Sequence, residues 1–189
     1  MLQLFNSVKG FMLLLFLVTT SLSFAQKTFQ LDAKPQLKIS GTSSLHDWDM
    51  VSETATGKLD ATFEGNKITT INSLVVEMPA ESIKSGKGGM DKNAYKALKT
   101  NQFKTVKFDL KSASKNADGT WNFNGTFNIA GVSKSVTLKI KETAVSGQSV
   151  FEGTYAFKLT DYDITPPTAL MGTVKTGNDV KISFIVKFK

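Results

Sequence analysis

The chain has 189 residues and no cysteine, so it can form no disulfide and offers no thiolate to a metal. All 23 basic residues are lysines, and the formal net charge is +7. Because the chain lacks the bidentate fork of arginine, we expect no nucleic-acid partner; weak contact with an anionic membrane surface is compatible with the positive charge.

The first 25 residues have the pattern of an export signal. Lys9 supplies a positive charge, Phe11–Val18 form an apolar core, and the segment ends in Ser23–Ala25 with small residues at the cleavage positions. The apolar core is too short to span a bilayer. We therefore expect a cleaved signal peptide over residues 1–25, a single domain over 26–189, and a periplasmic or secreted location.

Alternating apolar and polar residues predict strands through most of the remaining chain. In Thr120–Ala130, for example, Trp121, Phe123 and Phe127 alternate with asparagine and threonine, which places one face in a core and the other in water. The nine predicted strands cover residues 28–31, 36–42, 57–63, 68–78, 104–111, 120–130, 134–141, 150–160 and 179–189.

The stretch Gly41–Met50, GTSSLHDWDM, contains the only histidine, His46. If this stretch were a strand, Ser44 and His46 would share a face, as a serine hydrolase would require. No strained nucleophile turn or oxyanion hole is indicated. We therefore interpret His46 as a polar residue of a wall or lumen, and a hydrolase centred on it stays a separate hypothesis.

One short helix is predicted between the strands, over Lys92–Lys99 with Asp91 as its N-cap. Glycines precede this helix and lysines surround it, but the spacing of a phosphate-binding P-loop is missing. Two interpretations fit. The helix is either a lid over a barrel mouth, with Tyr95 and Leu98 directed inward, or a plain surface connection with a solvated face.

No metal site is predicted. One histidine and no cysteine are too few for a zinc or copper site. Asp161 and Asp163 could supply oxygen ligands, but they lack the spacing of a calcium loop, and we place them beside a turn stiffened by Pro166 and Pro167.

Many strands and one short helix predict an all-β barrel or sandwich. A barrel of about eight strands can fill its interior with side chains or hold one slender ligand. Alternation alone does not separate these architectures, because both bury one face of each strand.

The segment FNIAGVSKSVTLKI, Phe127–Ile140, resembles the signature of the YceI-like family, whose members are exported barrels that bind polyisoprenoid lipids. Four further segments fall in the order of that family: LKISGTSSLHDW, DKNAYKALKTNQFKTVKFDLKSAS, FKLTDYDI and GNDVKISFIVKF. The resemblance covers essentially all of residues 26–189. The chain departs from it at Met90–Asp91, where typical members have Arg-Asp, and at Phe103–Lys104, where they have Tyr-Pro.

The resemblance implies a lipocalin-like antiparallel β-barrel with an elongated apolar lumen. The lumen would hold the tail of an isoprenoid lipid, such as a quinone or a polyprenyl lipid, and no other cofactor is expected. A second hypothesis is a ligand-free packed barrel that acts as a structural or stress-related interaction module of the cell envelope. The candidate ligand-binding residues are Phe108, Trp121, Phe123, Phe127, Phe157 and Phe184, with His46, Tyr95 and Leu98.

Overall fold

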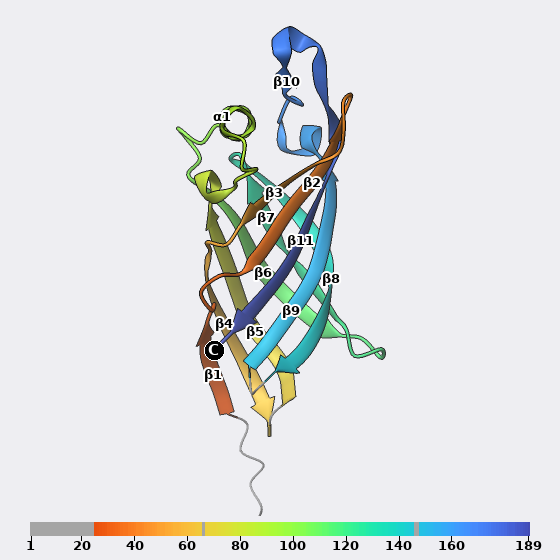
Figure 1. The fold of residues 1–189 in the computed structure, drawn as a ribbon. Coiled ribbons are helices and arrows are strands. Elements are labelled where there is room, and N and C mark those ends of the chain that lie inside the picture. The colour runs from red at the N-terminus through yellow and green to blue at the C-terminus, as the bar shows by residue number, and fades with distance from the viewer. Residues whose placement is uncertain (1–24, 66, 146–147) are drawn as a thin grey trace, which may run out of the picture.

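The computed structural model describes residues 25–65, 67–145 and 148–189, so residues 1–24 of the expected signal peptide lie outside the described part. The chain forms one curled antiparallel sheet with the order β1-β4-β5-β6-β7-β8-β9-β11-β2-β3, and β10 pairs with β11 (Figure 1). The strands are β1 (Ala25–Gln30), β2 (Gln36–Ser43), β3 (Trp48–Ser52), β4 (Thr56–Glu64), β5 (Lys67–Pro79), β6 (Thr105–Lys115), β7 (Trp121–Ile129), β8 (Val132–Val145), β9 (Gln148–Lys158), β10 (Thr168–Ala169) and β11 (Val174–Phe188).

The predicted all-β barrel is confirmed, and the inward face of its wall follows the apolar alternation. Along β7 the odd-numbered residues from Trp121 to Ile129 are buried, and the residues between them are half-exposed. The turn from β7 to β8 consists of Ala130 and Gly131, with φ of 50° and 83°. Positive φ at both positions is the geometry of a type I′ hairpin turn, which explains the Ala-Gly pair within Phe127–Ile140.

The edge strands β1 and β3 do not pair with each other; two short backbone contacts, which we call clasps, tie each of them to another part of the chain, β1 to the residue after β11 and β3 to the segment after η1. At one clasp Gln30 and Lys189 exchange backbone hydrogen bonds of 2.9 and 3.0 Å. At the other, Val51 of β3 and Lys84 exchange two hydrogen bonds of 2.8 Å. The clasps satisfy backbone groups that a free sheet edge would leave open to another chain.

Two strands were missed by the sequence analysis. β3 has the sequence WDMVS, in which Met50 and Ser52 are the buried residues. The buried serine and the exposed valine interrupt the alternation of apolar and polar residues. The sequence pattern therefore does not predict that this stretch is the second strand of a β2–β3 hairpin. β10 has only two residues, which is too few for a periodic pattern.

The predicted start of the helix was wrong. Helix α1 covers Gly88–Ala97 with Lys87 at its N-cap, so Asp91 lies inside the first turn. The Asp91 carboxylate accepts hydrogen bonds from the Ser85 backbone N–H (2.8 Å) and hydroxyl (2.6 Å), and these bonds lower its pKa. The low helix propensity of glycine concealed the true start. Three short 3-10 helices complete the fold: η1 (Ala80–Ser82), η2 (Leu159–Tyr162) and η3 (Leu170–Gly172).

Substitution of Gly125 tests how tightly the wall is packed. A Cβ atom there would lie 2.6 Å from the Phe108 ring and 2.6 Å from the Asp109 carbonyl oxygen. We expect Gly125→Ala to lower the free energy of unfolding by about 1–3 kcal/mol, the usual cost of overpacking. Urea denaturation measures the change.

The matched control is Gly88→Ala in α1, where nothing lies within 4 Å of the added Cβ. Alanine there should leave the free energy of unfolding unchanged or raise it by up to about 1 kcal/mol. Equal effects of the two substitutions would contradict the packing described for β7.

Candidate functional site

The lumen is closed at one end by an aromatic floor. Trp121, Phe123, Phe151 and Phe188 are at most 2% exposed and meet edge to face, with ring centroids 5.6–6.5 Å apart. The indole N–H of Trp121 donates a 2.8 Å hydrogen bond to the Glu142 carboxylate. These rings fill this end of the barrel, and Phe123 and Phe151 border the narrow cavity that lies above them.

Above the floor, the lumen widens in two steps. A narrow cavity of about 80 Å³ is followed by a wide one of about 920 Å³. The lining of the narrow cavity is entirely apolar. Both cavities are lined by Ile39, Met78, Val106 and Ile182, so they meet at this ring of side chains.

Helix α1 covers part of the wide cavity. Met90, Ala94 and Leu98 line the cavity at helical spacing, whereas Lys96 is exposed to solvent. Tyr95 does not belong to the lining. Its hydroxyl contacts the carbonyl oxygens of Glu81 (2.9 Å) and Ile83 (3.0 Å), so Tyr95 fixes the helix to the wall instead of pointing into the cavity, as the lid interpretation had expected.

The candidate aromatic residues lie at different depths, and Phe123 belongs both to the floor and to the lining of the narrow cavity. Phe108, Phe123, Phe127 and Phe184 line the narrow cavity, and Phe157 lines the wide one. Trp121 lines neither, because it is part of the floor. Sequence alternation identified the inward face of each strand but not the depth of each residue in the barrel.

His46 lies on the loop between β2 and β3, not on a strand, and it lines the rim of the wide cavity. Its Nδ1 atom is 2.6 Å from the Asp47 carbonyl oxygen. The Ser43 hydroxyl donates to the carbonyl oxygen of His46 (2.7 Å), and the Ser44 hydroxyl accepts from the Lys175 backbone N–H (3.0 Å). Both hydroxyls therefore hold the loop in shape, and neither is bonded to the imidazole.

An aromatic stack lies in the barrel wall where β8 and β9 diverge and do not pair. β8 pairs with β9 only beyond Ile140, and η2 contacts both strands where they diverge. Phe127, Tyr155 and Phe157 stack with centroids 5.1–5.2 Å apart. Phe157 then meets Tyr162 edge on, at 5.1 Å. The lumen wall thus continues across a region where the strands do not pair.

Tyr162 is fully buried, and its hydroxyl lies 2.9 Å from the hydroxyl of Tyr155. Burial, and next the bond to Tyr155, raise the pKa of Tyr162 well above its ordinary value, so the phenol stays neutral.

The described residues also bear on metal binding and on membrane spanning. They contain no cluster of three or more histidine, cysteine, aspartate or glutamate side chains that could hold a metal ion. Among the same residues, no helix has the length and apolar character needed to cross a membrane.

Comparisons with known proteins agree with this geometry. The family model described as the YceI-like domain matches residues 19–188. Similar solved structures include BcnA of Burkholderia cenocepacia (TM-score 0.65, 14% identity, 80% of this chain and 95% of that chain). A polyisoprenoid binding domain from Saccharophagus degradans has a TM-score of 0.66 at 10% identity, covering 85% of this chain and 97% of that chain. The YCEI protein of Campylobacter jejuni has a TM-score of 0.58 at 18% identity, covering 71% and 80%. No curated protein matches the chain.

The tyrosine pair behind the stack provides a test of the wall. Tyr155→Phe removes the partner of a buried hydroxyl, and we expect this to lower the free energy of unfolding by about 1–3 kcal/mol. In the double variant with Tyr162→Phe no orphaned hydroxyl remains, so the second substitution should cost less in the Tyr155→Phe background than in the parent chain. Urea denaturation of the four proteins measures the coupling, and additive effects would contradict the bond.

Proposed function

Because the chain belongs to the YceI-like domain family, we propose that it is an exported protein that holds the tail of an isoprenoid lipid, such as a quinone or a polyprenyl lipid, in its lumen. The predicted signal peptide over residues 1–25 supports a periplasmic or secreted location. The polyisoprenoid binding domain of Saccharophagus degradans, whose fold is similar, supports this class of ligand.

The observation that carries the proposal is the open lumen above the floor. Its wide part, of about 920 Å³, is at the upper end of the range of small-molecule sites. Inward-facing apolar residues such as Ile39, Ile182 and Phe184 are only partly buried. Apolar side chains that face inward and yet remain accessible leave space for an apolar occupant.

The chemistry of the lining suits a tail better than a polar ligand. An isoprenoid chain needs no hydrogen-bond partner, and the narrow cavity provides none. Each buried CH₂ contributes about 0.8 kcal/mol, and this gain is offset by ordering of the tail and by its removal from a bilayer or aggregate. Binding should therefore depend on tail length more than on the headgroup.

A headgroup would remain at the rim of the wide cavity. The polar residues of that rim include His46, Asn93, Lys87 and Lys92. Met90 stands where typical family members have arginine, and its side chain lines the cavity as an apolar contact. We infer that lysines, which attract anions without a fixed geometry, take the place of a bidentate headgroup contact.

We propose binding and not catalysis. The serine hydroxyls beside His46 are engaged with backbone groups, Ser43 with the His46 carbonyl oxygen and Ser44 with the Lys175 N–H of β11. A hydrolase would need one of them as a nucleophile within reach of the imidazole.

The alternative of a ligand-free packed barrel has support from the aromatic floor, which fills the lower lumen. It would require the wide cavity to be filled as well. Uptake of a fluorescent apolar probe separates the alternatives, because a packed barrel would take up none.

Phe127→Asp places an unpaired charge in the narrow cavity, where desolvation of a carboxylate is costly. We expect the affinity for a fluorescent apolar probe to fall at least about tenfold, which corresponds to about 1.4 kcal/mol. Asn128→Asp is the matched control, because it adds the same charge to the outer face of β7, opposite Lys107. If both folded variants bind the probe as the parent does, Phe127 does not line the binding site.

A series of quinones with increasing numbers of isoprene units tests the dependence on tail length. Affinity should rise with each unit while the tail lengthens inside the lumen, and it should level off once the tail fills the space above the floor. Competition with the apolar probe measures this dependence. Affinity that follows the headgroup and ignores the tail would contradict the proposed mode of binding.

A further inference from the structure

We propose that the mouth end of the barrel docks on an anionic lipid bilayer, with the tip at Leu170–Met171 inserted and the surrounding lysines against the headgroups. This proposal rests on the proposed function, because the bilayer would be the source or the recipient of the lipid tail. The mouth end is formed by α1, the β2–β3 loop and the hairpin of β10 and β11, which extends beyond the barrel (Figure 1).

The tip of the hairpin presents its apolar side chains to solvent. Leu170 is 73% exposed and Met171 is 107% exposed. Leu170, Met171 and Gly172 have φ of 48°, 57° and 89°, so two non-glycine residues in succession adopt the left-handed conformation. Such backbone is unfavourable for leucine and methionine, and this strained turn forms the exposed tip.

The hairpin that carries the tip is held at its base. Thr168 and Ala169 pair with Lys175 and Val174, and the Thr176 N–H donates a 3.0 Å hydrogen bond to the Pro167 carbonyl oxygen. Across the neighbouring loop, the Ser44 N–H donates to the Lys175 carbonyl oxygen at 2.9 Å. The exposed tip therefore stands on a paired base that is bonded to the barrel.

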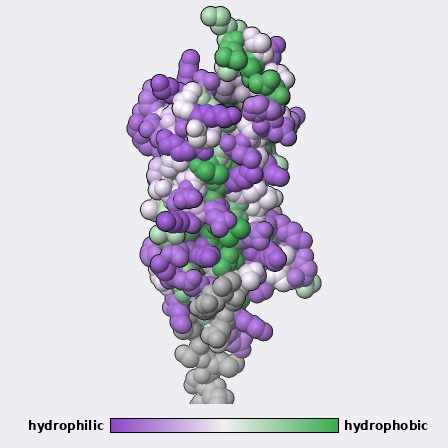
Figure 2. Space-filling model, in the orientation of Figure 1, coloured by the Kyte–Doolittle hydropathy of each residue, from purple (hydrophilic) through white to green (hydrophobic). Residues whose placement is uncertain are grey.

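Exposed apolar residues gather at this end of the molecule. Within the described ranges four large hydrophobic residues are exposed, and three of them, Leu45, Leu170 and Met171, belong to the mouth end. Figure 2 shows hydrophobic side chains over the projecting tip and in a narrow strip along the middle of the wall below it, which hydrophilic side chains flank on both sides. Single exposed apolar residues are ordinary, but a cluster on a projection marks an interaction surface.

The same tip borders the lumen. Leu170, Met171 and Val174 line the wide cavity together with Leu98 of α1. A bilayer in contact with the tip would therefore meet the opening of the cavity directly. A lipid tail could pass between bilayer and lumen along apolar side chains without crossing bulk water.

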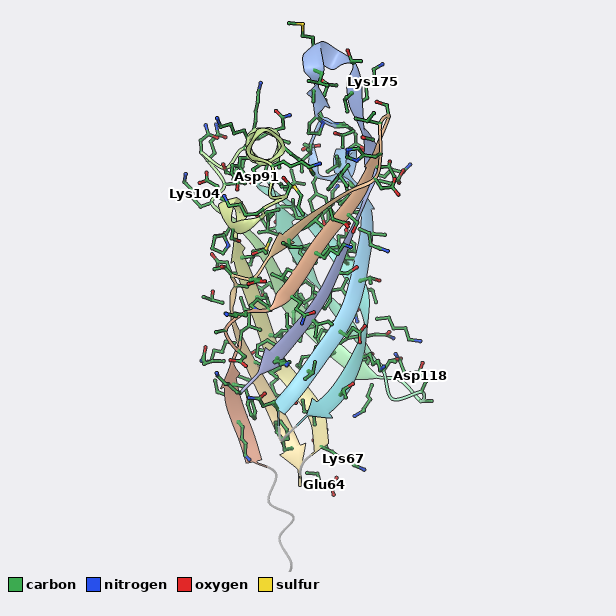
Figure 3. All side chains as sticks on the ribbon, in the orientation of Figure 1. Glu64, Lys67, Asp91, Lys104, Asp118 and Lys175 are labelled. Atoms are coloured by element: carbon green, nitrogen blue, oxygen red, sulfur yellow. The ribbon has the colours of Figure 1, made fainter. Side chains whose placement is uncertain are left out.

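The charges at the mouth end favour an anionic surface. Lys87, Lys92 and Lys96 are exposed on and beside α1, and Lys175 lies at the base of the hairpin (Figure 3). Asp91, the acid of α1, is turned toward Ser85 by two hydrogen bonds.

Other acids of this end are distributed around the lysines. Asp47 is exposed on the β2–β3 loop, Glu81 accepts a 2.8 Å hydrogen bond from Thr100, and Asp161 accepts one of 2.9 Å from the Lys158 N–H. The lysines of α1 thus face solvent, while Asp91 of the same helix is engaged by Ser85. Lysine clusters beside an apolar anchor are the usual composition of a surface that binds anionic lipid.

The shape of the surface argues against a second copy of the chain as the occupant. A stable protein interface buries about 1,200–2,000 Å² between complementary surfaces. A narrow convex tip cannot bury that area against another rigid surface, whereas a fluid bilayer closes around it. We therefore take the bilayer as the partner and leave self-association as an outcome of the test.

Binding of the purified full chain to vesicles is the primary measurement. Vesicles of phosphatidylcholine alone are compared with vesicles that also contain phosphatidylglycerol, by co-sedimentation at low and high salt. We expect at least about tenfold tighter binding to the anionic vesicles, weakened by salt because lysine contacts with headgroups are screened. Equal affinity for the two vesicle types, or none for either, would overturn the proposal.

The orientation of docking can be read from a single label, because the chain has no cysteine of its own. Met171→Cys carries an environment-sensitive dye at the tip, and Glu64→Cys carries the same dye at the opposite end of the barrel (Figure 3). Anionic vesicles should shift the emission of the Met171→Cys label to the blue and leave that of Glu64→Cys unchanged. A blue shift at both labels or at Glu64→Cys alone would overturn the assigned surface.

Two pairs of variants separate the contribution of the apolar tip, the anchor, from that of the lysines. Leu170→Ser with Met171→Ser should weaken binding to anionic vesicles about tenfold, whereas Val51→Ser, at an exposed position on β3, should not. Lys92→Gln with Lys96→Gln should reduce binding and its salt dependence. Lys67→Gln, at the far end of the barrel, should leave both unchanged (Figure 3). A tip variant that binds vesicles as the parent does would refute the anchor.

Uptake of an apolar probe by the parent protein in solution, without vesicles, distinguishes failure of docking from failure of lipid binding. A parent that takes up the probe but ignores anionic vesicles would refute docking and leave the lumen site intact. Sedimentation velocity of the parent and of the tip variant measures whether either protein self-associates. If the parent self-associates and the tip variant does not, the tip is a protein interface and the docking proposal is wrong.

Discussion

The constraint on which the structure depends is closure of one wide antiparallel sheet whose edge strands β1 and β3 do not pair. Each edge strand is instead tied by backbone bonds to another part of the chain, β1 through Gln30 to Lys189 after β11 and β3 through Val51 to Lys84 after η1. A sheet of this width encloses more volume than inward side chains can fill. Closure therefore creates a lumen, and the distribution of large aromatic residues decides which part of it is filled.

Aromatic residues have different roles along the barrel. At the floor, Trp121, Phe123, Phe151 and Phe188 interlock and provide core stability. Further up, Phe127 and Phe157 form part of a stack that replaces missing strand pairing between β8 and β9. Because Phe127 and Phe157 stack along the wall and line the cavities without filling them, the upper lumen stays open without loss of the closed fold.

Much of the barrel could be predicted from the sequence, because alternation in strands such as β7 is a local property. The depth of each residue in the lumen could not be predicted. Trp121 and Phe127 follow the same alternation, but Trp121 lies in the floor and Phe127 lines the narrow cavity. This difference depends on contacts with strands that are distant in the sequence. The lid interpretation places Tyr95 with Leu98 on the inward face of the helix, yet the Tyr95 hydroxyl bonds to the Glu81 and Ile83 carbonyl oxygens outside the cavity. The tip at Leu170–Met171 has no periodic signal, because it is a short turn beside a strand of only two residues.

The most direct test of the central claim is mass spectrometry of the organic extract of the protein, purified from the periplasm of a bacterium that expresses the full chain. The account predicts close to one isoprenoid lipid per folded chain. A well-folded protein that emerges without lipid, and that also takes up neither quinones nor polyprenyl lipids added afterwards, would contradict it.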